Sequence, residues 1–359
     1  MARSQNRYIF AQDAERRRKP HRFRNAVILF FIILIASLFI MNFVISNRVV
    51  FKTEKITLLN LPDDLENYTI LHISDLNGAE LGEKQKAIAT ALGNTRYSCV
   101  VMTGDMLGEN RDVQPLLDLI ALMPPETPKY YIPGDHDGSF IDPQAHGNLT
   151  VYADWAKKLQ DAGVTLLDYP ASETRGKSTI WFIPEELYSL NAEGMLDIYK
   201  RQLKKMEEQT GPLSADEAAM KRVLEYEIGR MQELIELRQE VKPEDIQVVL
   251  THMPLTEEYI SEMQAWTGKN DIFSFRYASL ILAGHYNGGQ WRVPFGPAIY
   301  VPGLGWFPED EKIQGTSYVF GIPQVISRGL GSSDAYPHMK GRLFNSPEIT
   351  LITLTSRYT

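Results

Sequence analysis

The sequence predicts an α/β fold, and two observations support that prediction. From Lys55 onward, apolar runs of strand length alternate with helix-favouring segments, a pattern typical of parallel strands covered by helices. Several apolar runs also end abruptly in acidic residues or histidine, as the run over residues 68–73 does at Asp75. Because ligands of open α/β sheets bind outside the carboxyl ends of the strands, we expect a functional site at that edge.

The first 25 residues differ in charge from the rest of the chain. They hold eight Arg and Lys and two acidic residues, whereas the whole chain has a net charge of −8. We interpret residues 1–25 as a disordered basic tail. The remainder is acidic and has no dense Lys/Arg block, which argues against sequence-specific nucleic-acid binding.

Residues 26–45 are apolar except for Ser37 and Asn42. Twenty helical residues rise about 30 Å, the thickness of a bilayer's hydrocarbon core. A core helix is rarely apolar on every face, and residues 42–50 lack the small-residue pattern of a signal-peptide cleavage site. We therefore predict an uncleaved, single-pass anchor in the cell membrane. Its basic N-terminal side should face the cytoplasm, so residues 46–54 should link it to an extracytoplasmic domain at 55–359.

The alternation within residues 55–359 predicts the order of elements along the domain. Crossover helices are expected at residues 83–92 and 113–122, with a further helix at 151–162. Strands are expected at 68–73, 99–103, 130–132, 164–167, 179–182, 248–250, 280–283, 298–301, 317–320, 324–327 and 348–355.

Residues 184–242 interrupt this alternation. They are charged and helix-favouring, with apolar residues at three- and four-residue steps on either side of Gly211-Pro212. Ser214 followed by Glu217 is typical of a helix start. We predict an inserted antiparallel helical hairpin. A packing appendage and a cap that covers the substrate both remain possible roles for it.

The strand ends carry side chains suited to metal binding. Carboxylate, imidazole and amide groups are ligands for Mn, Fe, Zn or Mg, and a carboxylate can bridge two such ions. The only cysteine, Cys99, lies in an apolar run, so a thiolate site and an intramolecular disulfide are excluded. The motifs at the strand ends are Asp75-x-Asn77, Gly104-Asp105, Gly134-Asp135-His136-Asp137, Thr251-His252 and Gly284-His285-Tyr286-Asn287.

This ordered set resembles the motifs of the calcineurin-like metallophosphoesterase superfamily over roughly residues 55–355. Residues 327–331 and 345–349 look like its membrane-anchored bacterial branch. The resemblance implies a four-layer αββα sandwich with a metal site at its edge, and metal-dependent hydrolysis of phosphomonoesters or phosphodiesters. It implies the following roles: Asp105 bridges two metals, Asp75 ligates the first, Asp135, His252 and His285 ligate the second, His136 acts as general acid or phosphate donor, and Asp137 orients the ring of His136.

Two departures from the family pattern affect the ligands of the same metal ion. Asn77 and Asn287 stand where the family has histidines that ligate the first ion. A neutral amide is a weaker ligand than imidazole, so we predict a strong second site and a weakened first site. Mn²⁺, Mg²⁺ or Ca²⁺ would suit the oxygen-rich first site better than a softer Zn²⁺ or Fe²⁺, and binding of only one ion is also possible.

Two further features could contact a substrate. Arg328 has a guanidinium group suited to phosphate, so we assign it a candidate substrate-binding role. Trp291, Trp306 and Phe307 follow the last metal motif. We interpret them as ordinary packing residues, with a substrate lip or a membrane-facing surface as alternatives.

Two functions are compatible with these residues. One is a metal-dependent phosphoesterase that acts outside the cytoplasm on lipid-linked or cell-wall phosphoesters. The other is a degenerate, non-catalytic module that binds metal or ligand, which the loss of two imidazoles would favour. Retention of Asp75, Asp105, His136, His252 and His285 favours catalysis. The substrate, its mono- or diester character, the metal and the oligomeric state remain open.

Overall fold

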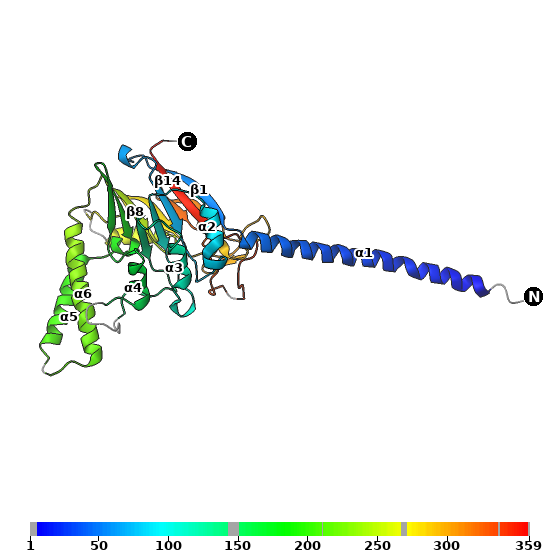
Figure 1. Cartoon of the computed structure of the whole chain (residues 1–359), viewed down its shortest axis with the longest axis horizontal. Coiled ribbons are helices and arrows are strands. Elements are labelled where there is room, and N and C mark those ends of the chain that lie inside the picture. Colours follow the sequence, from blue (N-terminus) through cyan, green and yellow to red (C-terminus); the bar gives the residue numbers. More distant parts are fainter. Residues whose placement is uncertain (1–5, 143–150, 210, 267–270, 337, 358–359) are drawn as a thin grey trace, which may run out of the picture.

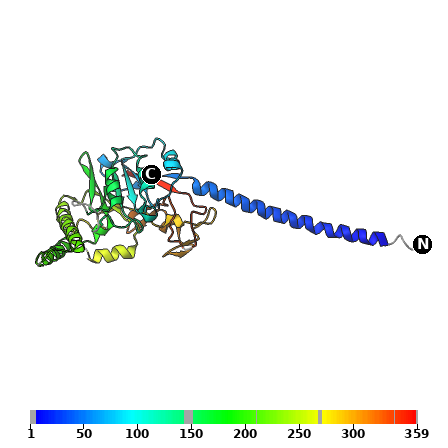
Figure 2. The same ribbon diagram turned by 60° about the horizontal axis from the view of Figure 1, so that its bottom comes forward.

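The computed structural model describes residues 6–142, 151–209, 211–266, 271–336 and 338–357. A long N-terminal helix, α1 (Asn6–Asn47), projects from an α/β domain that contains two six-stranded sheets (Figure 1). In two views 60° apart, the start of α1 lies far from this domain (Figure 2).

The first sheet is mostly parallel. Its strands lie in the order β1 (Val50–Thr57), β14 (Glu348–Thr355), β2 (Thr69–Ile73), β3 (Cys99–Thr103), β4 (Lys129–Ile132) and β5 (Thr165–Leu166). Only β14 and β2 pair in antiparallel fashion. The register pairs Ile70 with Cys99 and Val100 with Lys129, so β2, β3 and β4 end at one edge.

The second sheet has four parallel strands between two antiparallel edge strands. The order is β12 (Gly315–Val319), β13 (Ile322–Ile326), β9 (Ala278–Ala283), β8 (Ile246–Leu250), β7 (Ser178–Pro184) and β6 (Ala171–Arg175). Every residue of β8 is buried. Such continuous burial is expected of parallel strands that are covered on both faces.

The two sheets pack face to face between helical layers. Val101 of the first sheet and Phe182 and Leu280 of the second belong to one buried cluster, and Tyr130 stacks on Phe182 with ring centroids 4.4 Å apart. Residues of α2 (Lys86–Leu92), α3 (Gln114–Ile120) and α4 (Asp154–Asp161) pack on the outer face of the first sheet. Residues of α5 (Ala192–Glu207), α6 (Ala215–Leu237) and α7 (Glu257–Trp266) pack on the second. The predicted four-layer αββα sandwich is confirmed.

The helical hairpin expected within residues 184–242 consists of α5 and α6, which lie side by side at the end of the domain away from α1 (Figure 1). Ser214 caps α6: its side chain accepts from the Glu217 N–H, and the Glu217 carboxylate accepts from the Ser214 N–H. Met231 and Leu234 are buried, whereas Met220, on the same predicted face, is exposed. The second half of α6 therefore packs in the core beside the second sheet, and Ala219 and Leu224 of its first half are buried as well.

Two expectations about the chain's organisation were wrong in detail. The predicted linker at 46–54 is shorter, because β1 begins at Val50 and pairs along its whole length with β14. The basic tail was expected to be disordered, but α1 extends back to Asn6. Its Ala, Gln, Glu and Arg residues favour helix, and extending an existing helix avoids the cost of nucleation. The sequence analysis did not predict strands β6 and β11 (Gly305–Trp306) or helix α7. Strand β10 (Tyr300–Val301) lies within the strand that was expected at 298–301.

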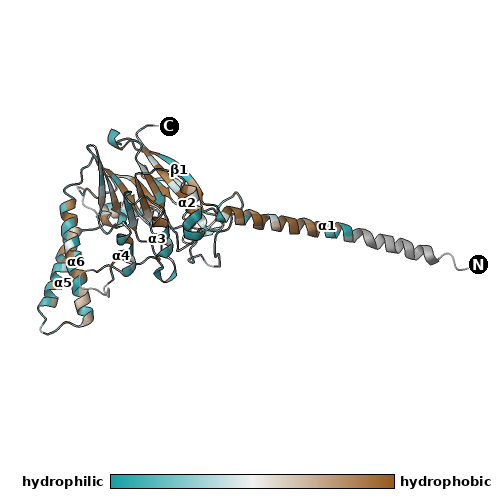
Figure 3. Cartoon of the chain, viewed as in Figure 1, coloured by the Kyte–Doolittle hydropathy of each residue, from teal (hydrophilic) through white to brown (hydrophobic). Residues whose placement is uncertain are grey.

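The segment Arg22–Asn47 of α1 is long and apolar enough to cross a membrane. Figure 3 shows hydrophobic residues along this part of α1 up to the domain. The end of the helix is fixed to the domain by hydrogen bonds. The Phe344 N–H donates to Asn42 Oδ1 (2.7 Å), and the Ser346 hydroxyl donates to the Ile45 carbonyl (2.9 Å).

The inter-sheet core generates a stability prediction. Phe182→Ala should reduce the free energy of unfolding by about 3–5 kcal/mol, because it removes a fully buried ring and leaves a cavity. Phe320→Ala, at a half-exposed phenylalanine, should change it by no more than about 0.5 kcal/mol. Urea titration of the detergent-solubilised chain measures both. Equal effects of the two variants would contradict this account of the core.

Candidate metal centre

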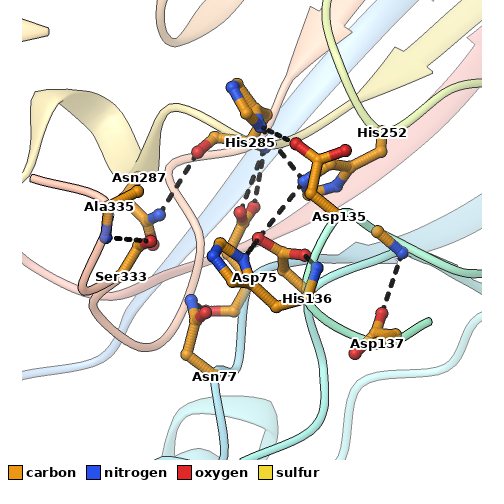
Figure 4. Close-up of polar contacts among 12 residues, drawn as sticks. Asp75, Asn77, Asp135, His136, Asp137, His252, His285, Asn287, Ser333 and Ala335 are labelled. Atoms are coloured by element: carbon orange, nitrogen blue, oxygen red, sulfur yellow. Dashed lines mark hydrogen bonds and ion pairs between the residues drawn. The ribbon is translucent and has the colours of Figure 1, made fainter. Parts of the chain in front are cut away.

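Five strand ends meet at one edge of the sandwich. Asp75 follows β2, Asp105 follows β3, the Asp135-His136-Asp137 segment follows β4, and His252 and His285 follow β8 and β9 of the second sheet. Figure 4 shows the side chains of Asp75, Asp135, His136, His252 and His285 gathered at this edge, with Asp137 lying apart from them. The loops after β3 and β4 touch at Gly104, where a Cβ would lie 2.5 Å from the Gly134 nitrogen. Only glycine allows so close an approach.

Asp105 is the central carboxylate of the cluster. Its Oδ1 accepts the backbone N–H of His136 (2.9 Å), and its Oδ2 lies 2.8 Å from His136 Nδ1 and 3.3 Å from His252 Nε2. The Nδ1 of His252 lies 2.8 Å from the Thr103 carbonyl. Because a carbonyl can only accept, the proton belongs on Nδ1, which leaves Nε2 as the atom that can ligate a metal.

Asp75 and His285 complete the buried part of the site. The backbone N–H of His285 lies 3.1 Å from each carboxylate oxygen of Asp75. The His285 Nδ1 lies 3.2 Å from His252 Nε2 and 3.3 Å from Asp135 Oδ2. The ring nitrogens of His252 and His285 and the Asp135 carboxylate thus lie close together. Two groups have ligand atoms within 4.8 Å of one another: Asp75, Asp105 and His252, and Asp135, His252 and His285.

The electrostatics of the cluster are dominated by buried negative charge. Burial raises the pKa of Asp75 to about 6, although the charge of His252 opposes this shift. Burial also opposes protonation of His252, but its hydrogen bond to Asp105 and the charges of Asp75 and Asp105 outweigh that effect and raise its pKa to about 10. The cluster therefore retains a positive charge among its carboxylates, and metal binding must displace the His252 proton.

The backbone at the site adopts unusual conformations. Asp75, Asn77, Asp105, His285 and Asn287 all have left-handed φ values, between 49° and 76°. Asp and Asn tolerate this region, but histidine does so less readily. Backbone strain of this kind concentrates at functional sites, where the surrounding structure fixes it.

The donor atoms fit a divalent metal on one side of the centre. Asp105, Asp135, His252 and His285, which the resemblance implied as ligands of the second ion, contact one another and supply oxygen and nitrogen donors suited to Mn, Fe or Zn. These four residues would hold the ion.

The other side, where Asn77 and Asn287 were expected as ligands, is less complete. Asn287 is buried, its amide nitrogen donates to the His285 carbonyl (3.3 Å), and its amide oxygen lies 3.5 Å from Nη2 of Arg342. Asn77 donates its amide nitrogen to the Asp75 carbonyl (3.2 Å). The oxygen that would replace one lost imidazole thus faces a guanidinium group, which disfavours a cation there.

Arg342 is a site residue that the sequence did not indicate. Its guanidinium donates to the carbonyls of Gly331 (2.6 Å) and Arg328 (2.7 Å) beside Asn287. Burial and the charge of Arg328 lower the pKa of Arg342 to about 9, and the charge of Asp75 opposes this shift. The group therefore stays charged at neutral pH. A single arginine in an irregular loop carries no pattern that would have pointed to it.

Asp137 does not have the role that the resemblance implied. It was expected to orient the His136 ring, but it is fully buried and accepts the backbone N–H groups of Met106, Leu107 and Gly134 at 2.8–2.9 Å. The ring of His136 contacts Asp105 instead. Asp137 therefore fixes the loops after β3 and β4, and Asp105 orients His136.

Arg328 is also engaged elsewhere. Its Nη2 donates to Asn345 (2.6 Å), and its Nη1 lies 3.8 Å from Glu348. These contacts direct its guanidinium toward the start of β14, so a role in binding phosphate remains a prediction without structural support.

A cavity of about 490 Å³ adjoins the centre. Gly134, Thr251 and His252 line it on one side, and Tyr226 and Arg230 of α6 line it on the other. The hairpin is tied to this wall because the hydroxyl groups of Tyr152 and Tyr226 both donate to Asp168. Arg230 bonds the Asp168 carbonyl (2.6 Å) as well.

Comparisons with known proteins identify the family of this chain. The family model for calcineurin-like phosphoesterases matches residues 68–287. No curated protein matches the sequence. The crystal structure of phosphopantetheinyl hydrolase (PptH) from Mycobacterium tuberculosis is similar at 16% identity and a TM-score of 0.37, covering 80% of this chain and 96% of that one. Since the family model matches more than half of the chain, the protein belongs to the calcineurin-like phosphoesterase family.

The unequal halves of the centre generate a prediction about metal content. After equilibrium dialysis against Mn²⁺, the wild-type chain should retain about one ion, because Asn287 faces Arg342 on the first-metal side. The double variant Asn77→His, Asn287→His should retain more, since it restores two imidazoles. Elemental analysis of the dialysed protein measures both. Asn60→His, at an exposed asparagine, is the control, and two tightly held ions in the wild type would contradict the prediction.

The cavity wall generates a pH prediction. Burial, reinforced by the charge of Glu186, raises the pKa of Glu185 to about 7. The folded protein thus holds this proton more tightly than the unfolded chain. The resulting stabilisation is present below the unfolded pKa and is lost as the pH rises through 7, a difference of about 3 kcal/mol.

We therefore expect Glu185→Gln to be more stable relative to the wild type at pH 8 than at pH 5. Urea titration at the two pH values measures this difference. Glu244→Gln, at an exposed glutamate, should show no such pH-dependent gain. A Glu185→Gln effect that is equal at both pH values would refute the assignment.

Proposed function

We propose that this protein is a catalytically active, metal-dependent phosphoesterase held at a membrane with its catalytic domain outside the cytoplasm. The observation that carries the proposal is the arrangement around Asp105, which contacts both His136 and His252. A cluster that only stabilised the fold would not require a half-exposed histidine that is hydrogen-bonded to a buried carboxylate. This arrangement supports a role for His136 as a proton donor next to the candidate metal ligands.

The residues of the centre divide the chemistry between them. A bound divalent ion would activate water and neutralise charge on the phosphoryl oxygens. Burial disfavours protonation of His136, but its hydrogen bond to Asp105 and the nearby charges of Asp105 and Asp135 outweigh that effect and raise its pKa. With Nδ1 held by Asp105, the Nε2 of His136 is the atom available to donate a proton to the leaving oxygen.

Membrane anchoring is supported by α1. Its segment Arg22–Asn47 has the length and composition of a membrane span, and its last turn bonds the folded domain through Asn42, Ile45 and Ser46. A helix that contributes contacts to the fold is better explained as a retained anchor than as a cleaved signal peptide. The basic residues before it favour a cytoplasmic N-terminus.

The cavity beside His252 is the proposed site for the alcohol part of the substrate. Asp168, Glu185, Glu186 and Glu227 line it together with Arg230. Carboxylates outnumber the arginine, so a neutral or cationic group fits better than an anionic one. Because α6 forms one wall, we favour a substrate-contacting role for the hairpin over a packing role. Lipid-linked and cell-wall phosphoesters fit the proposed location.

The alternative function is a non-catalytic, metal-binding module. The contact between Asn287 and Arg342 favours it, because it weakens one half of a two-metal centre. The two functions differ in turnover, and the variant experiment that follows separates them.

With Mn²⁺, the full chain in detergent should hydrolyse bis-p-nitrophenyl phosphate or p-nitrophenyl phosphate. His136→Gln should lower kcat by about 10²–10⁴-fold without loss of bound metal, because it removes the proton donor but no ligand. Asp105→Asn should lose both metal and turnover. His338→Gln, at an exposed histidine, is the matched control. Metal retention without turnover on either ester would support the non-catalytic module.

A further inference from the structure

Large apolar side chains are exposed on the loops that follow the last metal motif. Phe295 is 92% exposed, Trp306 67% and Phe307 60%, and Val293 and Leu304 are each more than a third exposed. We call these five residues the apolar rim. Several large apolar side chains in contact with water are unfavourable in a soluble surface, and such patches mark interaction sites.

The loops present these side chains outward rather than leaving them loosely packed. Phe295 lies at the tip of a tight turn in which the Gly296 N–H donates to the Val293 carbonyl (2.8 Å) and the Val293 N–H donates to the Pro297 carbonyl (3.0 Å). Leu304 and Trp306 belong to the β10–β11 hairpin. Both Phe295 and Phe307 have left-handed φ values, which are unfavourable for bulky residues. The backbone thus accepts strain while these rings remain exposed.

The apolar rim adjoins the end of the membrane-type helix. Ile45, Val293, Phe295 and Phe344 line a common cavity of about 690 Å³. In Figures 1 and 2 the loops after β9, coloured yellow to orange-brown, lie beside the domain end of α1. Hydrogen bonds from Phe344 and Ser346 to the last turn of α1 fix this position.

We propose that the apolar rim inserts into the interfacial region of the same bilayer that α1 crosses; the proposal rests on the membrane anchoring in the proposed function. The apolar run of α1 ends at Ile45, so the boundary of the hydrocarbon core lies at the level of that residue. Phe295 lines the same cavity as Ile45 and therefore lies near that boundary. Trp and Phe are suited to this interface, where apolar rings meet lipid head groups.

Membrane contact at the apolar rim would also position the metal centre. His285 and Asn287 lie on the same loop as Val293. Asn345 donates to the Asn287 carbonyl (2.7 Å), while its neighbour Phe344 bonds Asn42 of α1. The domain would then be held at two points, the helix and the rim, with the centre close to the head groups. This geometry suits a phosphoester in a lipid head group.

A fluorescence experiment on the full chain in lipid nanodiscs tests the proposal. The variants Phe295→Cys and Phe307→Cys, each with one added cysteine, would be labelled with a nitrobenzoxadiazole probe; the native Cys99 is buried and should not react. Phe320→Cys is the matched control, because Phe320 is also exposed, has a similar positive φ, and lies between β12 and β13 away from the cavity with Ile45. Phe31→Cys, within α1, reports insertion of the helix.

The expected result is a blue-shifted emission at positions 295 and 307, quenched by lipids with a doxyl group near the top of the acyl chain, and neither effect at position 320. Unquenched emission at 295 and 307 would overturn the proposal, whether the probes are exposed to water or covered by protein. Quenching at position 31 but not at 295 or 307 would refute insertion of the apolar rim, while still supporting α1 as a membrane anchor. Because the readout does not depend on turnover, its failure is distinct from failure of the phosphoesterase proposal.

Discussion

Burial of two carboxylates, Asp75 and Asp105, at the edge of the sandwich is the constraint on which the site depends. A buried charge costs several kcal/mol unless it is paired and hydrogen-bonded. Here the compensation comes from His252, whose ring lies 3.3 Å from Asp105, and from the backbone N–H groups of His136 and His285. Each compensating group comes from a different strand end, so the two sheets must pack in one register for the cluster to exist.

The same constraint accounts for the shape of the loops. To aim N–H groups at the carboxylates, the chain turns sharply after β2, β3 and β9 and places Asp75, Asp105 and His285 in left-handed conformations. Asp137 fixes these loops to each other, because its carboxylate accepts hydrogen bonds from backbone N–H groups of the loop after β3 and of the loop after β4. Fixed loops hold the ligand atoms in place before any metal binds, which limits the reorganisation that binding requires.

Local signals in the sequence predicted the α/β class, most strands and the residues that converge at the strand ends. The four layers were expected only from the family resemblance. The sequence did not predict which polar partner each side chain selects. Asp137 follows His136 directly, yet packing turns it into the core. Strand β1 was missed because its edge position exposes Thr53 and Lys55, and its partner β14 lies almost 300 residues away. Arg342 was missed because its burial beside Asn287 is set by an irregular loop.

The charge balance of the centre is consistent with the two asparagines. In a centre with two divalent ions, positive charge on both sides of Asp105 would offset the carboxylates and a bound phosphate. In this chain the imidazoles on one side are replaced, and the charged guanidinium of Arg342 lies next to Asn287. A fixed cation near Asp75 lowers the need for a second metal ion, because attraction at short range in a buried site is strong. We therefore expect the loss of the two histidines to weaken metal binding on that side without leaving the carboxylates uncompensated.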